Sequence, residues 1–453
     1  MARRSSAFLV LLLTFAAQTL CTVSAGNYLV GINYNGPANF TSLPPSKAVA
    51  LIKSLGVRRV RLADADAHVL AALAKSGLDV VIVVPDEDIP ALAASENNAI
   101  EWIQKNVIAF FPETHITALN VGDNIFDDQH LKSLWVHLLP AMTNLQTALR
   151  QQDLTNLIKV TTSFSMDVFS VTFPPTAGTF RADIAKIFIA PILDFLTQTK
   201  TPLYLNVYPY LDFQKDPNHI PLSFALFNSP GIPTWLDNNL SYYNLLDAQL
   251  DAAAFAMEGL GYSNIDIVIS ATGWPTAGGP GASMTNAFKY NQGLVNKVVE
   301  SPRVGTPHRP KKAVPAFINA LVDDSKSGLK WGVFSADGSM AYPLQVWQWK
   351  GACSPAQSPG MGPAMGPVPA KSHGVSKGAG DSTVAPAASP DYSSDSSDAP
   401  HADDNSAPAP SVHGDYGLGF ESPAPGPSSP AAGTHPLLPR CVLLMLLAAL
   451  WLA

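Results

Sequence analysis

Eight apolar, β-branched runs alternate with helical patterns between Asn27 and Val346, and this alternation leaves the chain few possible folds. The expected strands cover residues 28–34, 57–63, 79–85, 116–122, 157–164, 203–210, 266–273 and 330–336. Runs such as DVVIVVP are apolar on both faces, which is typical of parallel strands buried under helices. The strict alternation predicts an α/β fold, a (β/α)8 TIM barrel. An open doubly wound sheet is the alternative, but no glycine-rich phosphate loop follows the first run.

Both ends of the chain carry patterns of removable targeting signals. Residues 1–25 combine a basic start with an apolar stretch that is short for a membrane span and a small-residue cleavage site, which predicts a signal peptide. Residues 435–453 end in the apolar run CVLLMLLAALWLA, behind a spacer and the small residues of Ser428–Gly433. This order predicts a glycosylphosphatidylinositol (GPI) signal, with the attachment residue between Ser428 and Gly433. The alternatives are an N-terminal membrane anchor and a C-terminal tail-anchored helix.

Residues 347–434 separate the globular region, 26–346, from this tail, and they are dominated by Pro, Ala, Ser and Gly. Such a segment cannot bury enough apolar surface to offset the entropy of ordering, so we expect a disordered stalk, either O-glycosylated or an unmodified spacer. Removal of both signals leaves Cys353 as the single cysteine, which excludes an intramolecular disulfide in the mature chain. The sequons NFT and NLS predict N-glycosylation at Asn39 and Asn239.

The charge pattern excludes several partners. The net charge is −7 and no basic block is present, which argues against nucleic-acid binding. The ten histidines lack metal-ligand spacing, so we expect no metal and no cofactor.

Asp127 is expected on a solvated loop or as a helix cap. We expect the mature protein to be a monomer.

Polar and aromatic residues occupy the carboxyl ends of the expected strands, where barrel proteins carry their chemistry. The acidic ones are Asp64, Asp86, Asp123 and Asp337. The aromatic ones are Tyr34, Tyr208 and Trp274. Aromatic rings stack on the C–H faces of sugars, which favours a carbohydrate site. The alternative is that these rings pack loops against the barrel.

From Asn27 to Leu344 the chain resembles plant endo-1,3-β-glucanases of glycoside hydrolase family 17. The resemblance rests on ordered motifs, among them GINYNG, LGVRRVRLADAD, VVIVVPDEDI, LNVGDN, FPPTAGTFR, PLYLNVYPYL, VISATGWPTAGG and WGVFSADGS. It implies a (β/α)8 barrel with an open cleft for linear β-1,3-glucan. It also implies that Tyr34, Arg61, Tyr208 and Trp274 shape that cleft and contact the substrate.

The chain departs from the family at both catalytic positions. The family carries an acid/base Glu after the fourth strand and a nucleophilic Glu on the seventh, the pair that a retaining glycosidase needs. Here VGDNIF places Asn124 at the acid position, and SATGWP places Ala271 at the nucleophile position. An amide is no general acid and a methyl group cannot attack carbon. An auxiliary acidic position is shortened to Asp324.

Asp123, one residue before the acid position, is the candidate for a relocated acid. Successive strand residues point to opposite faces, which weakens this candidate without excluding it. No base near Ser270 or Thr272 in sequence could activate either as a nucleophile. The leading hypothesis is therefore a GPI-anchored protein on the outer face of the plasma membrane that binds β-1,3-glucan with weak or no hydrolysis. The rivals are an active endo-1,3-β-glucanase and a surface interaction protein that acts through its glycosylated stalk.

Overall fold

The computed structural model describes residues 29–35, 43–127, 129–229, 231–299, 304–323 and 328–346. Both predicted signals, the stalk, Asn39, Asp324 and Cys353 lie outside these residues. No helix in the described ranges is both long and apolar enough to cross a membrane.

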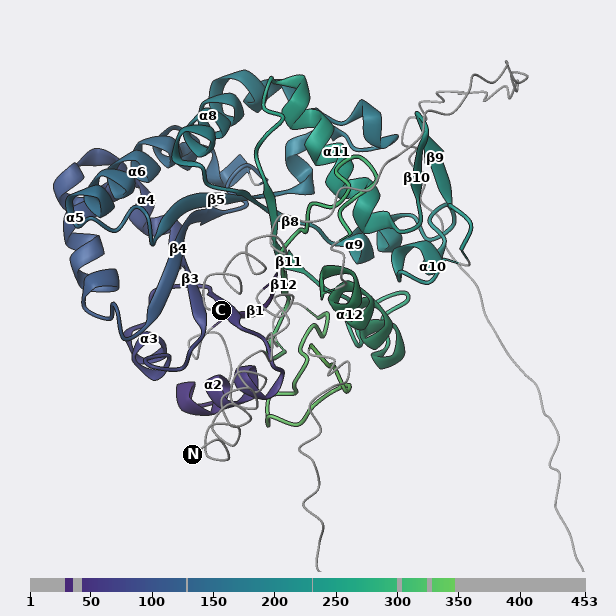
Figure 1. Ribbon diagram of the computed structural model, residues 1–453, viewed down its shortest axis with the longest axis horizontal. Helices are drawn as coiled ribbons and strands as arrows, with labels where there is room; N and C mark the ends of the chain where they lie inside the picture. Colours follow the sequence, from purple (N-terminus) through teal and green to yellow (C-terminus); the bar gives the residue numbers. More distant parts are fainter. Residues whose placement is uncertain are drawn as a thin grey trace, which may run out of the picture. The chain divides into compact units, whose positions relative to one another are not determined.

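Eight parallel strands close into a barrel, which confirms the predicted fold and excludes the open sheet (Figure 1). Around the barrel the strands follow in the order β1, β2, β3, β4, β5, β8, β11 and β12, and β12 pairs with β1 again. Their bounds are Val30–Tyr34 (β1), Arg59–Leu62 (β2), Asp79–Val84 (β3), His115–Asp123 (β4), Lys159–Ser165 (β5), Leu203–Asn206 (β8), Ile267–Thr272 (β11) and Ala316–Ile318 (β12). The closing register pairs Ile32 with both Val60 and Ile318.

The eighth strand is not where the sequence predicted it. Residues 330–336 were expected to form it, but the barrel is closed by Ala316–Ile318, a fully buried strand of three residues. The segment 330–336 makes only isolated bridges, such as that between Val322 and Phe334. Its buried side chains give it an apolar pattern like that of a strand. Asp337 therefore lies on an exposed turn, where it accepts hydrogen bonds from Ser339, and not at the end of a barrel strand.

Helices surround the barrel, and two small antiparallel sheets extend its loops. The α-helices are Pro45–Ser54 (α2), Ala67–Ala72 (α3), Ile89–Ala94 (α4), Glu96–Ile103 (α5), Lys132–Gln151 (α6), Ala182–Ile184 (α7), Ala190–Thr199 (α8), Pro209–Lys215 (α9), Leu222–Ala225 (α10), Leu245–Gly259 (α11) and Met284–Val299 (α12). The small sheets pair Phe169–Val171 (β6) with Thr179–Phe180 (β7), and Trp235–Asp237 (β9) with Leu240–Tyr242 (β10). Side chains cap several helices; Asp66, for example, accepts from His68 N and Val69 N at the start of α3.

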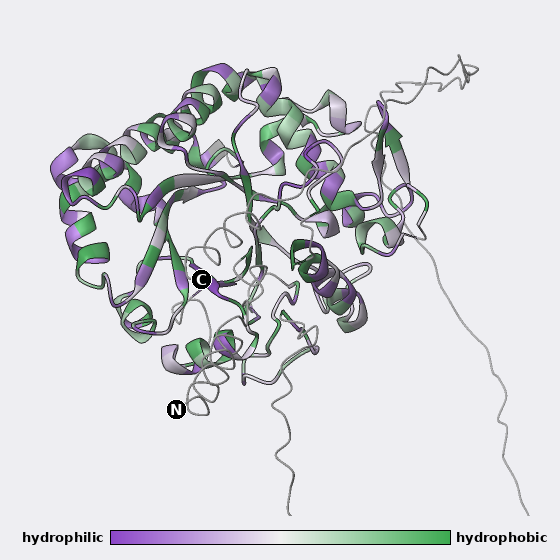
Figure 2. Cartoon of the chain, in the orientation of Figure 1, coloured by the Kyte–Doolittle hydropathy of each residue, from purple (hydrophilic) through white to green (hydrophobic). Residues whose placement is uncertain are grey.

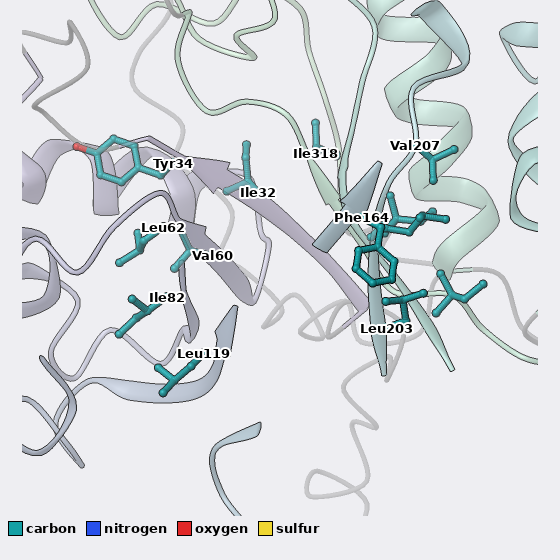
Figure 3. Packing of buried hydrophobic residues seen from close by; sticks show 14 of the residues in the cluster. Ile32, Tyr34, Val60, Leu62, Ile82, Leu119, Phe164, Leu203, Val207 and Ile318 are labelled. Atoms are coloured by element: carbon teal, nitrogen blue, oxygen red, sulfur yellow. The ribbon is translucent and has the colours of Figure 1, made fainter. Parts of the chain in front are cut away.

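The core has two parts because side chains alternate along each barrel strand. The outward residues pack against the helices, and Figure 3 shows Leu62, Ile82 and Leu119 of three strands side by side in this layer. Figure 2 shows that the surrounding helices carry both hydrophobic and hydrophilic stretches, as helices with one buried face do. The barrel interior holds a separate cluster, which consists of Val81, Ala118, Tyr204, Val268 and Phe317.

Candidate functional site

Asn206, the last residue of β8, links three strand ends at the mouth of the barrel. Its Nδ2 donates to Asp123 Oδ1 and to Asn124 Oδ1, both at 2.8 Å. Its Oδ1 accepts from Ser270 Oγ at 2.6 Å. Asn206 is 5% exposed and pairs in register with Ala271 of β11. The side chains of Asn124 and Ser270 are thus both tied to one buried amide, and Ala271 lies beside Asn206 in the strand register.

The backbone at the end of β4 leaves strand geometry. Gly122 and Asn124 have φ values of +67° and +62°, in the left-handed region that glycine and asparagine tolerate best. A Cβ on Gly122 would lie 2.1 Å from Ile125 Cδ1, so only glycine fits there without rearrangement. Because of this turn, the consecutive side chains of Asp123 and Asn124 both reach Asn206. The expectation that strand alternation separates these two residues is therefore wrong.

Asp123 forms an ion pair with Arg61 of β2. Arg61 Nη2 lies 2.8 Å from Asp123 Oδ2, and the exposed fractions of the two side chains are 6% and 33%. The same guanidinium nitrogen donates to Ser163 Oγ at 3.4 Å. Both carboxylate oxygens of Asp123 are thus acceptors, one from Arg61 and one from Asn206. This geometry makes Asp123 the ion-pair partner of a buried arginine, with both of its oxygens already engaged.

Two further carboxyl groups lie near Asp123, and the pKa of each is raised. Burial, followed by the charge of Asp123, raises the pKa of Asp86 to about 6. Burial also raises the pKa of Asp127 to about 6, although Ser165 Oγ donates to Asp127 Oδ1 at 2.6 Å. Asp127 is half-buried and its side chain accepts from Ser165, so it does not lie on a fully solvated loop. The sequence signal for the burial of Asp127 was its pair of apolar neighbours, Ile125 and Phe126, which are both buried.

The raised pKa of Asp86 predicts a pH dependence of stability. As the pH rises from about 4 to about 6, the unfolded chain loses this proton before the folded chain does, so the free energy of unfolding falls over this window. Asp86→Asn removes the ionisation and keeps an acceptor for the backbone N–H of Asp123. The difference in the free energy of unfolding between Asp86→Asn and the unsubstituted chain should therefore change in favour of the variant by about 1–2 kcal/mol from pH 4 to pH 7. Urea unfolding at the two pH values measures it.

The control for this measurement is Asp194→Asn on the exposed surface of α8. A stability difference between Asp86→Asn and the unsubstituted chain that is the same at both pH values would contradict the prediction.

Ala271 presents only a methyl group at the position where the resemblance implies a nucleophile. It is 5% exposed, and its carbonyl accepts from Val207 N at 3.0 Å. Its neighbours are both fully buried and hydrogen-bonded. Ser270 donates to Asn206, and Thr272 Oγ1 lies 2.6 Å from Tyr290 Oη. Neither hydroxyl contacts a base, as the sequence predicted, so neither is an activated nucleophile.

Of the four residues expected to contact substrate, only Tyr208 retains appreciable exposed surface. Its ring meets Trp331 edge to face at 5.3 Å, and burial with the charge of Asp123 raises its pKa, so its hydroxyl remains a hydrogen-bond donor. Tyr34 and Arg61 are 2% and 5% exposed. They support the mouth and offer little surface to a ligand.

Trp274 has no exposed surface, so the expected stacking on a sugar ring does not match its place in the structure. Its ring packs between Tyr210, Phe213 and Tyr290, with centroid distances of 5.0, 5.7 and 5.8 Å. Its Nε1 donates to Gly281 O at 2.9 Å. Trp274 therefore holds the loop after β11 against α12. The alternative interpretation, that such rings pack loops against the barrel, applies to this residue.

Asp64 lies away from the Asn206 network. It lines an open cavity of about 460 Å³ beside the loops after β2 and β3, together with Asp66, Asp88 and Trp102. Burial raises the pKa of Asp64. No group of three His, Cys, Asp or Glu residues within the described ranges is arranged to hold a metal ion.

Sequence reasoning did not single out Asn206, although it is the centre of the site. The sequence signal for Asn206 was an amide at the end of the apolar strand LYLN, because a buried polar group requires hydrogen-bond partners. Which partners it would have could not be predicted, since Asp123, Asn124 and Ser270 lie 64 to 83 residues away in sequence.

Comparison with known proteins shows which family the chain resembles. The model of glycosyl hydrolases family 17 matches residues 30–346. The chain belongs to this family. It is 38% identical over 324 residues to a probable glucan endo-1,3-beta-glucosidase, A6, of Arabidopsis thaliana, a match covering 70% of this chain and 67% of that protein. It is 36% identical over 325 residues to glucan endo-1,3-beta-glucosidase 13 of the same plant, a match covering 70% of this chain but only 63% of that protein.

Solved structures of plant glucanases share the fold. CJP38, a beta-1,3-glucanase and pollen allergen of Cryptomeria japonica, superposes with a TM-score of 0.67 at 35% identity. A plant beta-glucan endohydrolase gives a TM-score of 0.64 at 33% identity. Each match covers 70% of this chain and 99% of the other. The family 17 fold is thus retained, whereas positions 124 and 271 carry no carboxyl group.

Proposed function

We propose that this protein binds β-1,3-glucan at the mouth of its barrel and hydrolyses it weakly or not at all. The ligand class is suggested by the relatives, which are named as glucan endo-1,3-beta-glucosidases. The loss of hydrolysis is suggested by one observation, that Asn124 and Ala271, which both neighbour Asn206, carry no carboxyl group themselves. A retaining glycosidase needs two carboxyl groups about 5–5.5 Å apart across the scissile bond.

Hydrolysis through relocated acids is the second candidate function. It is favoured by one observation, the presence of Asp86 and Asp127 near Asp123 with pKa values of about 6, which suits a general acid. Against it, the ion pair with Arg61 engages Asp123, and the contacts around Ala271 include no substitute nucleophile. The first function therefore accounts for more of the site.

Tyr208 is the residue that most directly tests binding at the mouth. We expect Tyr208→Ala to weaken binding of laminarin about tenfold, because Tyr208 is the partly exposed aromatic residue of the mouth and carries a hydroxyl donor near Asp123. The measurement is isothermal titration with laminarin-derived oligosaccharides. Tyr262→Ala is the matched control, since Tyr262 is also half-buried but precedes β11, at the opposite end of the barrel. Equal affinities for Tyr208→Ala and Tyr262→Ala would contradict binding at the mouth.

We propose in addition that the protein is held on the outer face of the plasma membrane by a GPI lipid. The support is the order of N-terminal apolar segment, stalk and C-terminal apolar tail in the sequence. Asn239, one of the two sequon residues, is exposed in the turn between β9 and β10. Its side chain is therefore accessible for attachment of a glycan. Phosphatidylinositol-specific phospholipase C should release the protein from cell membranes. Retention after complete digestion would contradict the anchor.

A further inference from the structure

Two aromatic rings lie together on the surface of the loops beyond β5 and β8. The rings of Phe173 and Trp235 have centroids 4.4 Å apart at an interplanar angle of 55°. Their exposed fractions are 48% and 40%, and Leu236 beside them is 66% exposed. Exposed aromatic pairs are costly to keep in water and commonly mark a contact surface. We call Phe173 and Trp235 the aromatic ledge.

The ledge is held rigidly by the loops that carry it. Thr176 N donates to Asp237 Oδ2 at 2.7 Å, and Thr176 Oγ1 donates to Asp237 Oδ1 at 2.9 Å. This bidentate contact joins the segment after β6 to β9. Gly178 lets the same segment pass against α11, since a Cβ there would lie 2.1 Å from Ala252 O. A surface fixed in this way loses little conformational entropy when it binds a ligand.

The ledge belongs to the same face of the barrel as the mouth. Phe173 lies between β5 and α7, and Trp235 lies between β8 and α11, so both follow the carboxyl ends of neighbouring strands. Asn206, at the centre of the mouth, ends one of these strands. Figure 1 shows β9 and β10 at the periphery, outside the ring of barrel strands. A ligand that spans mouth and ledge must therefore be a long chain.

We propose that the aromatic ledge is an accessory contact for β-1,3-glucan, which binds the part of a long chain that extends beyond the mouth. This rests on the proposed function, because it takes the same polysaccharide as ligand. Sugar rings present apolar C–H faces that suit half-exposed aromatic rings. A lipid surface is the less suitable occupant, because residues 171–177, 229 and 231–244 contain no Lys or Arg to meet anionic headgroups.

The test compares two ligand lengths across three variants of the full mature protein. Ledge variants Phe173→Ala and Trp235→Ala should weaken binding of long-chain laminarin about three- to tenfold and leave laminaritriose binding unchanged. Trp235→Tyr, which keeps a ring, should retain most of the affinity. The control is Ile187→Ala, which removes an apolar side chain that is even more exposed, at 69%, from the helical layer. Urea unfolding of each variant checks that the fold is intact.

Each outcome separates the ledge from the proposed function. If wild type binds both ligands and the ledge variants bind laminarin as wild type does, the ledge proposal is overturned and binding at the mouth stands. If wild type binds neither ligand, both proposals fail. If the ledge variants lose adsorption to phosphatidylcholine vesicles and keep laminarin affinity, the ledge is a membrane contact and the proposal is wrong.

Discussion

The double variant Asn124→Glu with Ala271→Glu should release reducing sugar from laminarin about 10²- to 10⁴-fold faster than the unsubstituted chain. This range is the usual contribution of a general acid alone, and the new carboxylate at position 271 would also supply a nucleophile. The scaffold favours this outcome, because Asn206 Nδ2 already donates to the side chain of residue 124 and Asn206 pairs in register with residue 271. The reaction needs both groups, so each single variant should stay near the background rate.

The matched control for the double variant is Asn124→Gln with Ala271→Gln, which adds similar volume without an ionisable group. A folded glutamate variant that is no faster than the glutamine variant would show that the strand ends no longer aim these side chains at one another. Similar urea midpoints for the two variants would establish that both are folded.

Arg61→Ala should cost about 2–3 kcal/mol in the free energy of unfolding. Removing one partner of a buried ion pair typically costs 3–5 kcal/mol, and the 33% exposed fraction of Asp123 reduces this figure through solvation of the remaining carboxylate. The substitution also removes the donor to Ser163 and leaves a void under the mouth. Arg61→Lys should recover only part of the loss, since an ammonium group cannot reproduce the planar guanidinium contacts. Urea unfolding at pH 7 measures both.

Arg150→Ala on α6 is the control for Arg61→Ala, because Arg150 is exposed and its removal should change the free energy of unfolding by less than about 0.5 kcal/mol. An Arg61→Ala protein as stable as Arg150→Ala would mean that the ion pair with Asp123 does not hold the site together.

The periodicity of the sequence was sufficient to predict the barrel, but it failed at the eighth strand. Seven of the expected runs overlap barrel strands, because buried parallel strands are nearly continuous in apolar residues. The eighth strand was misassigned, since three residues at 316–318 carry too little pattern and residues 331–334 of the loop segment are buried as a strand would be.

The site was predicted only as far as local chemistry allows. The absence of carboxyl groups at Asn124 and Ala271 follows directly from the sequence. The hydrogen bonds of Asp123 do not, because they depend on the left-handed backbone at Gly122 and Asn124. The burial of Trp274 was also beyond local patterns, since the loop from Gly273 to Gly281 folds its ring inward against residues far along the chain.

Reducing-sugar release from laminarin by the purified, unsubstituted protein tests the central claim most directly. Positions 124 and 271 carry no carboxyl group, so under the proposed function release should not exceed that of the glutamine double variant at any pH between 4 and 7. Turnover on the order of 1 to 10³ per second, the ordinary range for enzymes, would contradict the claim.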